Sequence, residues 1–522
     1  MGAFLNGSPA GSSTTFGTFN NSTATTFTPG DNIQATGTNN ILNLSDAGTG
    51  GTGTLNVAAT VSGEQTLVIN SGETVVFNAK TAAAGFTGLT QITATTASVG
   101  GLAADAPTTI TAAATTNVTV TDTATDISAP AGKFAGVTVA GGNNVSVTES
   151  GSTATASKVI VGGAITTNPA GTVNITLATG AGTTTVASDG GTTVNVTAVS
   201  GTSGTITIGA TTASTGAVTV TTAGTNAVTV SSGPSATVTQ TGTATANGAV
   251  HITGVTGAST LTVTGVASTA SYITGGTGAT ATTTGGSAVT LGGTAAGTGI
   301  VPIAGNATIV DTFSGPNTDI LSVYATGNVS VTTTADSGNI VIGSATKANS
   351  PTGTVTLVNQ TVAGSATYYG TSTTTINTNG STAINQTGGA GTTIADNTTA
   401  NVLATLNLTG VNGAVGATST ALTSVNINNN TALDPLNAAR TATVVTVSNS
   451  TANHTLAIGL SGNTNALTQV IDDVAKNITI TATGTTANNF SLRSQLAGAH
   501  AVNVTNNSTG LLDIVSQKSF VL

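Results

Sequence analysis

Apolar and polar residues alternate in short segments along most of this chain. The stretch from Thr172 to Thr264 contains a succession of such segments, separated by spacers rich in Gly, Ser, Ala and Thr. Side chains of a β-strand point alternately to opposite faces, so Val194 and Val196 share one face and the polar residues beside them share the other. Each segment therefore predicts a short strand with one buried and one solvated face.

The predicted strands recur at short intervals of 10 to 12 residues in this stretch, which leave no room for helices between them. Regular short strands with small-residue turns indicate an all-β sandwich, barrel or solenoid. The same rhythm recurs from Val118 to Val502. The strand starts in the central stretch are Val194, Ile206, Val218, Val228, Val238, Val250 and Leu261.

Composition narrows the choice of fold. Only 5% of the 522 residues are charged and 3% are aromatic, whereas roughly a quarter of an average globular protein is charged. A core of Val, Ile, Ala and Thr methyl groups suits the thin interior of a solenoid better than one large globular core. We expect an all-β fold of solenoid-like repeats, with β-sandwich domains as an alternative for the C-terminal half.

Charge and cysteine content exclude several classes of partner. Eight basic residues stand against seventeen acidic ones, for a formal charge of −9, and the basic residues form no cluster. Nucleic acids and anionic membranes both require a basic patch, so neither is expected as a partner. There is no cysteine, which excludes disulfides and thiol-based sites. No apolar stretch approaches the about 18 residues of a membrane-spanning helix, so no membrane span is expected.

Changes in residue composition and in strand spacing divide the chain into four segments. Residues 1–30 carry four of the ten phenylalanines and are expected to form an N-terminal arm. Residues 31–280 form the predicted solenoid-like domain, and 300–400 a second β domain. Residues 401–522 form a third, with a helix predicted at 465–476 and an apolar tail that suits an export signal or a closing strand.

One segment carries a family resemblance. The sequences Thr28-Pro-Gly-Asp-Asn and Ile41-Leu-Asn-Leu-Ser-Asp precede the Thr-Val-Thr repeats. From the N-terminus to the end of the predicted solenoid-like domain, this arrangement resembles secreted bacterial surface-layer proteins and related large adhesins. The resemblance implies a β-solenoid, assembly into a two-dimensional lattice on the cell surface, frequent calcium dependence and type I export. The calcium-binding repeat Gly-Gly-x-Gly-x-Asp is absent, and Asn39 and Asn40 stand where an Asp is typical.

The scarce acidic residues are the candidate metal ligands. Calcium takes six to eight oxygen ligands, which turns rich in Asp, Asn and backbone carbonyl groups can supply. The pair Asp31 and Asp46 and the pair Asp311 and Asp319 are therefore the candidate calcium sites. The alternative is that these residues are turn formers, because Asp bonds its own backbone.

No constellation for catalysis is evident. The three histidines form no ligand pair, and no Gly-x-Ser-x-Gly motif is accompanied by a suitable histidine and acid. Polysaccharide lyases with solenoid folds use charged grooves, and this chain lacks the charges. We therefore expect a protein that is not an enzyme.

These observations favour a structural, self-assembling extracellular protein of a cell-surface lattice, whose partners are copies of itself and a cell-surface polysaccharide. A fibre subunit and an adhesin stalk are the alternatives. Thr-x-Thr rows could also bind ice, but ice binding requires a flat, uniform array, and the variable intervals between strands argue against one.

Overall fold

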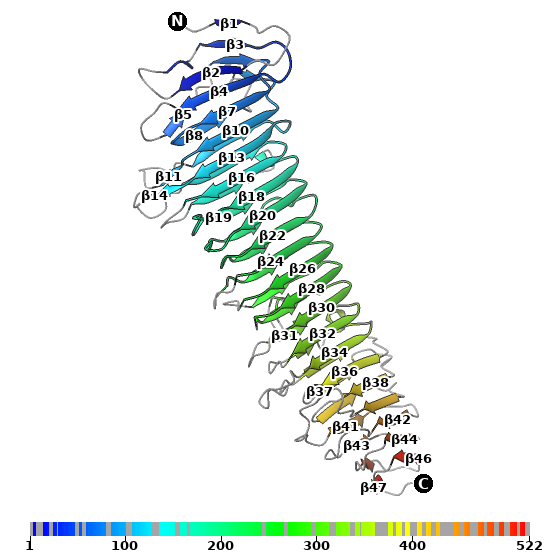
Figure 1. Cartoon of the computed structure of the whole chain (residues 1–522). Coiled ribbons are helices and arrows are strands. Elements are labelled where there is room, and N and C mark those ends of the chain that lie inside the picture. The colour runs from blue at the N-terminus through cyan, green and yellow to red at the C-terminus, as the bar shows by residue number, and fades with distance from the viewer. Residues whose placement is uncertain are drawn as a thin grey trace. The chain divides into compact units, whose positions relative to one another are not determined.

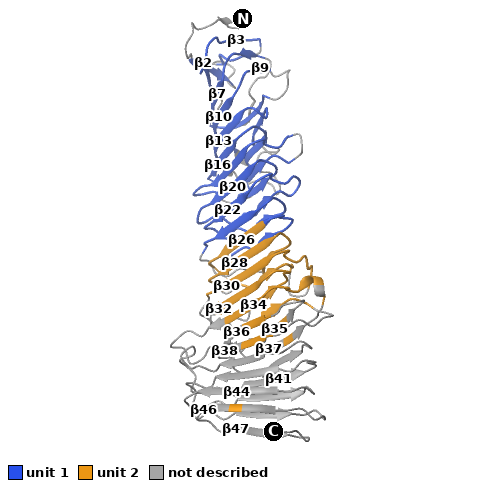
Figure 2. Ribbon diagram, turned by 90° about the vertical axis from the view of Figure 1, so that its right-hand side faces the viewer, with its two compact units in different colours: residues 1–257 blue, residues 258–522 orange. Residues whose placement is uncertain are grey.

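The computed structural model describes two compact units, residues 1–257 and 258–522 (Figures 1 and 2). After residue 360 only the strands are described. Before it, the described residues are 4–6, 14–19, 25–28, 30–46, 52–54, 59–79, 85–100, 107–126, 135–151, 157–163, 167–242, 247–265, 270–285, 287–294, 298–312, 320–334, 340–344 and 346–360.

Unit 1 is a β-solenoid in which the chain passes alternately through two parallel sheets. The first sheet contains β2 (Thr14–Phe19), β4 (Ile41–Asp46), β7 (Thr66–Asn70), β10 (Gln91–Thr96), β13 (Asn117–Thr123), β16 (Val145–Ser150), β18 (Thr172–Leu177), β20 (Thr193–Ala198), β22 (Val218–Thr222) and β24 (Ala236–Gln240). The second sheet contains β5 (Thr52–Thr54), β8 (Thr74–Asn78), β12 (Thr108–Ala112), β15 (Gly136–Gly141), β17 (Lys158–Val161), β19 (Thr185–Ser188), β21 (Ile206–Ile208), β23 (Val228–Val230) and β25 (Val250–Ile252). Two smaller sheets contain β1 (Phe4–Asn6), β3 (Asn32–Gln34), β6 (Thr60–Ser62) and β9 (Phe86–Thr87), and β11 (Val99–Gly100) with β14 (Thr125–Asp126).

Unit 2 has the same architecture. Its first sheet contains β26 (Ala258–Val263), β28 (Gly278–Thr283), β30 (Asn306–Asp311), β32 (Val329–Thr334), β34 (Val355–Gln360), β36 (Ala383–Gly388), β38 (Thr405–Thr409), β40 (Ser424–Asn428), β42 (His454–Gly459), β44 (Ile478–Gly484) and β46 (Val502–Ser508). Its second sheet contains β27 (Ser271–Ile273), β29 (Val289–Leu291), β31 (Leu321–Val323), β33 (Ile340–Ile342), β35 (Thr374–Thr378), β37 (Thr392–Asp396), β39 (Ala414–Thr418), β41 (Thr443–Ser448), β43 (Thr468–Asp473), β45 (Phe490–Ser494) and β47 (Leu512–Ser516). A 3-10 turn, η3 (Lys347–Asn349), follows β33.

The strand pairing confirms the solenoid and decides against the sandwich alternative for the C-terminal half. Each described strand of the two main sheets pairs in parallel with strands of the same sheet on adjacent turns, as β30 does with β28 and β32 and β44 does with β42 and β46. Sandwiches are built instead from antiparallel strands. The described strands from β30 to β47 therefore continue the solenoid pattern of unit 2.

The core consists of columns of small branched side chains, one from each turn. In the first sheet of unit 1, Val173, Val194 and Val218 are in register and fully or almost fully buried. Ile175, Val196 and Val220 form the next column in the same way. Neighbouring strands lie about 4.8 Å apart, so each buried side chain packs on its counterparts above and below. This explains how so few aromatic residues suffice.

The predicted helix at 465–476 is wrong. The structure has β43 there, and Val470 is in register with Val445 of β41 and Leu492 of β45. Apolar residues at helical spacing produced the prediction, but the β-branched Val470 and Ile471 are also good strand formers. Two ladders of backbone hydrogen bonds, one to each neighbouring turn, favour the strand.

The two described strands of the N-terminal segment pair with strands of the solenoid. Within residues 1–30, which were predicted to form an arm, β1 pairs with β3 and β2 pairs with β4. Phe27 is buried and packs against Phe86, with ring centroids 6.2 Å apart. Phe77 meets Phe86 edge to face at 5.1 Å. These rings fill the interior near the start of unit 1, where such a cluster contributes about 1 kcal/mol per ring pair beyond area burial.

Among the residues that the structure describes, there is no helix with the length and apolar character needed to cross a membrane.

Candidate functional site

The candidate calcium ligands of the first turns have separate hydrogen-bond partners. Asp31 is almost fully buried, and its carboxylate accepts hydrogen bonds from the backbone N–H of Thr28 at 2.6 Å and from the Thr28 hydroxyl at 3.1 Å. Asp46 ends β4 and accepts a hydrogen bond from the Ser71 hydroxyl at 2.5 Å. Asp31 thus makes the local contact expected of a turn former.

Of the second candidate pair, the structure describes Asp311 but not Asp319. Asp311 ends β30, is fully buried and accepts a hydrogen bond from the Thr283 hydroxyl at 2.8 Å. It therefore lies inside the solenoid, not at its surface. Asp319 lies outside the described residues. Across the described parts of the chain, no three His, Asp or Glu side chains gather as a metal site would require, so calcium binding stays a prediction.

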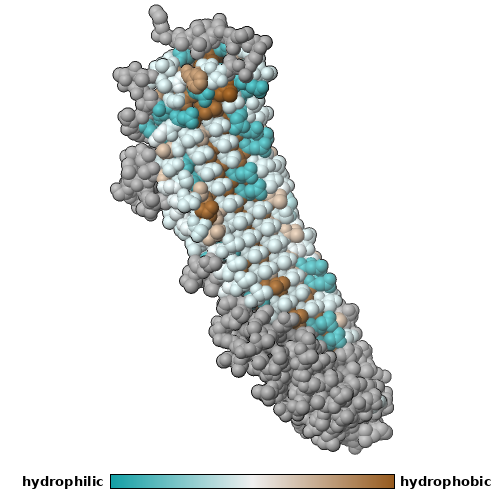
Figure 3. Space-filling view, viewed as in Figure 1, coloured by the Kyte–Doolittle hydropathy of each residue, from teal (hydrophilic) through white to brown (hydrophobic). Residues whose placement is uncertain are grey.

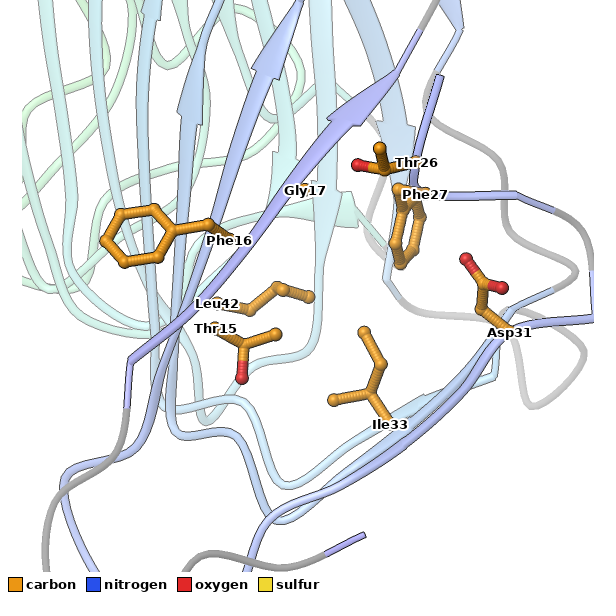
Figure 4. Close-up of a pocket in the computed structure, with 8 residues that line it drawn as sticks. All are labelled: Thr15, Phe16, Gly17, Thr26, Phe27, Asp31, Ile33 and Leu42. Atoms are coloured by element: carbon orange, nitrogen blue, oxygen red, sulfur yellow. The ribbon is translucent and has the colours of Figure 1, made fainter. Parts of the chain in front are cut away.

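A shallow pocket adjoins Asp31 (Figure 4). Phe27, Ile33 and Leu42 provide its apolar wall, and all three are buried. Phe16 of β2 points away from the pocket and is 76% exposed, more than any other described large apolar side chain. The pocket itself has the composition of a small gap in the core, whereas Phe16 is available for contact with another molecule.

The most unusual chemistry of unit 1 lies inside the solenoid, at a pair of carboxyl groups. Asp122 of β13 and Glu149 of β16 are in register on adjacent turns, and both are fully buried. The alternation places them there, because Asp122 has the same parity as the buried Val118 and Val120. Strict alternation to the ends of these strands predicts that each carboxyl group is buried, but only the register makes the two residues partners.

Hydrogen-bond donors surround Asp122. The Thr96 hydroxyl donates to its Oδ1 at 2.5 Å, the Ser98 N–H donates to Oδ1 at 3.0 Å, and the Ser98 hydroxyl donates to Oδ2. The Ser98 oxygen in turn accepts from the Gly136 N–H at 2.8 Å. These donors favour the ionised form of Asp122, although burial raises its pKa above the ordinary value.

Glu149 has a poorer set of donors. The Ala124 N–H donates to its Oε1 at 3.2 Å. Burial, and then repulsion from the charge of Asp122, raises the pKa of Glu149 to about 10. The raised pKa favours the protonated form of Glu149 at neutral pH, and its side chain is hydrogen-bonded to that of Asp122. The two side chains expose no surface on which a substrate could bind.

A second polar cluster lies where β22 turns toward β23. Asn226 is fully buried, and its Oδ1 accepts hydrogen bonds from the hydroxyls of Thr202 and Thr222, both at 2.7 Å. Its Nδ2 donates to the Gly204 carbonyl at 2.7 Å. Every polar atom of this side chain is thus used to connect neighbouring turns, which is a structural role.

On the outer face of the first sheet in each unit, amide side chains on adjacent turns form hydrogen-bonded pairs. Asn195 donates to the Oδ1 of Asn174 at 2.9 Å, and in unit 2 Asn407 donates to that of Asn385 at 2.6 Å. Such pairs stabilise stacked parallel strands.

Comparison with known proteins assigns neither a family nor a function to the chain. No family model matches the chain, and no curated protein or solved structure matches it either.

Proposed function

We propose that this protein is a structural, self-assembling extracellular protein that forms a lattice on a cell surface. The observation that carries the proposal is a surface almost without charge on which β2 offers a strand edge and an exposed aromatic ring. Among the described strands only β4 pairs with β2, and Phe16 projects from β2.

Strand edges bind other strands unless charge, proline or a covering element prevents it. β2 reads Thr-Thr-Phe-Gly-Thr-Phe and contains neither charge nor proline. A parallel ladder can therefore continue from β2 into a strand of another molecule, with Phe16 contributing apolar contact. Head-to-tail contacts of this kind generate open arrays when they do not close into a ring.

The weak charge of the chain favours dense packing, since subunits with few charges repel one another little. The proposal includes a cell-surface polysaccharide as anchor and calcium as an ionic contact near Asp31 and Asp46.

Electron microscopy of the purified protein at increasing concentration, with calcium and then with chelator, tests the proposal. Sheets are expected, and their loss in chelator would support the ionic contact. Filaments would favour a fibre subunit instead. Protein that stays monodisperse at high concentration in both conditions would overturn self-assembly and favour an adhesin stalk.

The contribution of β2 is tested by Phe16→Lys, which places a charge at the strand edge. We expect at least a ten-fold higher concentration for assembly. Val301→Lys in unit 2 is the matched control, because Val301 is also exposed, at 54%, but lies outside any strand. Equal effects of the two substitutions would show that only net charge matters.

A further inference from the structure

The outer face of the first sheet in unit 1 carries two regular columns of hydroxyl-bearing and amide side chains. One column is threonine on every turn from β10 to β24, and each member is in register with the next. Its members are partly or fully exposed. They are Thr95, Thr121, Thr148, Thr176, Thr197, Thr221 and Thr239.

The second column stands two residues earlier on the same strands. It contains threonine on β10, β13, β22 and β24, with serine or asparagine between. Its members are Thr93, Thr119, Ser146, Asn174, Asn195, Thr219 and Thr237. The two columns together form one array on a layer of parallel strands, which Figure 1 shows as ribbons. The array has Thr-x-Thr on β10, β13, β22 and β24, Ser-x-Thr on β16 and Asn-x-Thr on β18 and β20.

The uneven spacing in sequence does not disturb this array. The chain between Thr148 and Thr176 is clearly longer than the chain between Thr221 and Thr239, yet both pairs are register partners. The loops between the sheets absorb the whole difference. The sequence-based argument against a uniform array is therefore wrong, because strand intervals do not determine register.

The opposite sheet of the same unit provides an internal comparison. The corresponding outward column runs through Thr138, Ile160, Ala187, Thr207, Thr229 and His251, with apolar, polar and titratable residues mixed. High overall threonine content thus does not by itself produce a uniform column. The regularity is a property of the first sheet.

The array lacks the groups that other partners require. None of its members is charged or aromatic, and the surface over these strands is mostly pale in Figure 3, neither strongly hydrophilic nor strongly hydrophobic. Protein interfaces are anchored by Trp, Tyr and Arg, and threonine is under-represented among their hot spots. Nucleic acids and anionic lipids need basic side chains.

The repeat distances instead match those of ordered water. In a tetrahedral network with O–H···O distances of about 2.75 Å, second-neighbour oxygens lie about 4.5 Å apart. Threonines of one column repeat at the strand spacing of roughly 4.8 Å. The difference of about 0.3 Å per turn accumulates to about 2 Å between Thr95 and Thr239, less than half of one water repeat.

Along the strands the agreement is coarser but matters less. The two columns lie roughly 6.6 Å apart, against a repeat of about 7.3 Å along the long axis of the same hexagonal network. Only two columns lie in this direction, so the mismatch of about 0.7 Å occurs once and does not accumulate.

We propose that this two-column array on β10 to β24 binds ice. Each hydroxyl both donates and accepts hydrogen bonds, so it can take the place of a water molecule in the lattice. Each methyl group restricts the orientation of the water around it. The absence of charge avoids the strongly oriented hydration shells that would compete with the lattice.

The test uses the full chain at a concentration at which light scattering shows it to be monodisperse. Ice adsorption is measured as incorporation of dye-labelled protein into a growing ice hemisphere and as the gap between melting and freezing temperatures. Thr176→Tyr places a bulky ring at the centre of the array. Thr207→Tyr is the matched control on the outer face of the second sheet.

We expect the wild type and Thr207→Tyr to enter the ice and Thr176→Tyr to lose at least ten-fold of both signals. Exclusion of the wild type from ice overturns the proposal, as does equal behaviour of the two variants. If Thr176→Tyr impairs self-association without changing ice adsorption, the face is an interface between copies and the proposal is wrong. Should Thr176→Tyr fold poorly, Thr176→Ser, which removes one methyl group, is expected to reduce the temperature gap measurably.

Discussion

Glu149 lies in register with Asp122 on the next turn of the solenoid, with both carboxyl groups fully buried. The pKa of Glu149 is raised from 4.5 to about 10, so the folded state keeps a proton that the unfolded chain releases. Stability therefore falls as pH rises from about 5 to about 10, by at most about 1.4 kcal/mol per pH unit for this group. The raised pKa of Asp122 acts in the same direction.

Glu149→Gln tests this linkage. The amide can still donate to Asp122 but does not titrate, so most of the pH dependence in this window is expected to disappear. The variant should be more stable than the wild type at pH 9, as measured by urea unfolding. If the free energy of unfolding of Glu149→Gln changed with pH between 5 and 9 as steeply as that of the wild type, Glu149 would not be the group that holds the proton.

Shortening a side chain of an interior column should lower the free energy of unfolding substantially. Ile175→Ala removes a side chain that is 1% exposed and is expected to cost about 2–5 kcal/mol. Because each turn contacts only its neighbours, the faster hydrogen exchange should be confined to strands around β18. Thr176→Ala on the outer face is the control, with an expected cost of about 0.5 kcal/mol or less.

The Asn226 cluster predicts a strong effect of a small polar change. Asn226→Ala leaves the hydroxyls of Thr202 and Thr222 and the Gly204 carbonyl without this partner in the interior. The free energy of unfolding is expected to fall by about 3 kcal/mol. Asn195→Ala breaks an amide pair on the solvated face, and the same urea titration should show a loss nearer about 0.5 kcal/mol. Comparable losses would indicate that burial of the cluster does not matter.

Two glycines that look alike in sequence should differ when replaced by alanine. A Cβ at Gly204 would lie 1.9 Å from the Thr184 carbonyl oxygen, whereas a Cβ at Gly72 would meet nothing within 4 Å. Gly204→Ala is expected to lower the melting temperature by several degrees, because adjacent turns must separate. Gly72→Ala should leave the melting temperature unchanged or raise it slightly, since such a substitution adds at most about 0.4–1 kcal/mol to the free energy of unfolding. A harmless Gly204→Ala would show that the turns are less closely packed there.

Alternation alone predicted the strands well. The starts expected at Ile206, Val218, Val228 and Val250 are the first residues of β21, β22, β23 and β25. Their periodicity is a local property, so it is visible in a single sequence. Which strands pair is not local. Two strands make each turn, and the register of Thr221 with Thr239 depends on loops whose lengths do not reveal it.

The interior polar groups were missed for a different reason. The position of Asp122 alone does not predict that it lies in the interior, because a charged side chain inside a narrow core is costly unless it is paired. Its partner Glu149 is distant in sequence, on the next turn, and only the register brings the two together. The same property hid the threonine array, whose regularity exists across turns and not along the sequence.

The pairing of every turn with only its two neighbours has a consequence for how such a chain can evolve. Duplication of the coding segment for one turn adds a new coil whose backbone finds ready partners above and below, while the rest of the protein is untouched. Length is then set by the gene and not by the geometry of a closed core. Lineages carrying such a gene are therefore expected to differ by whole coils, with substitutions accumulating fastest in the loops.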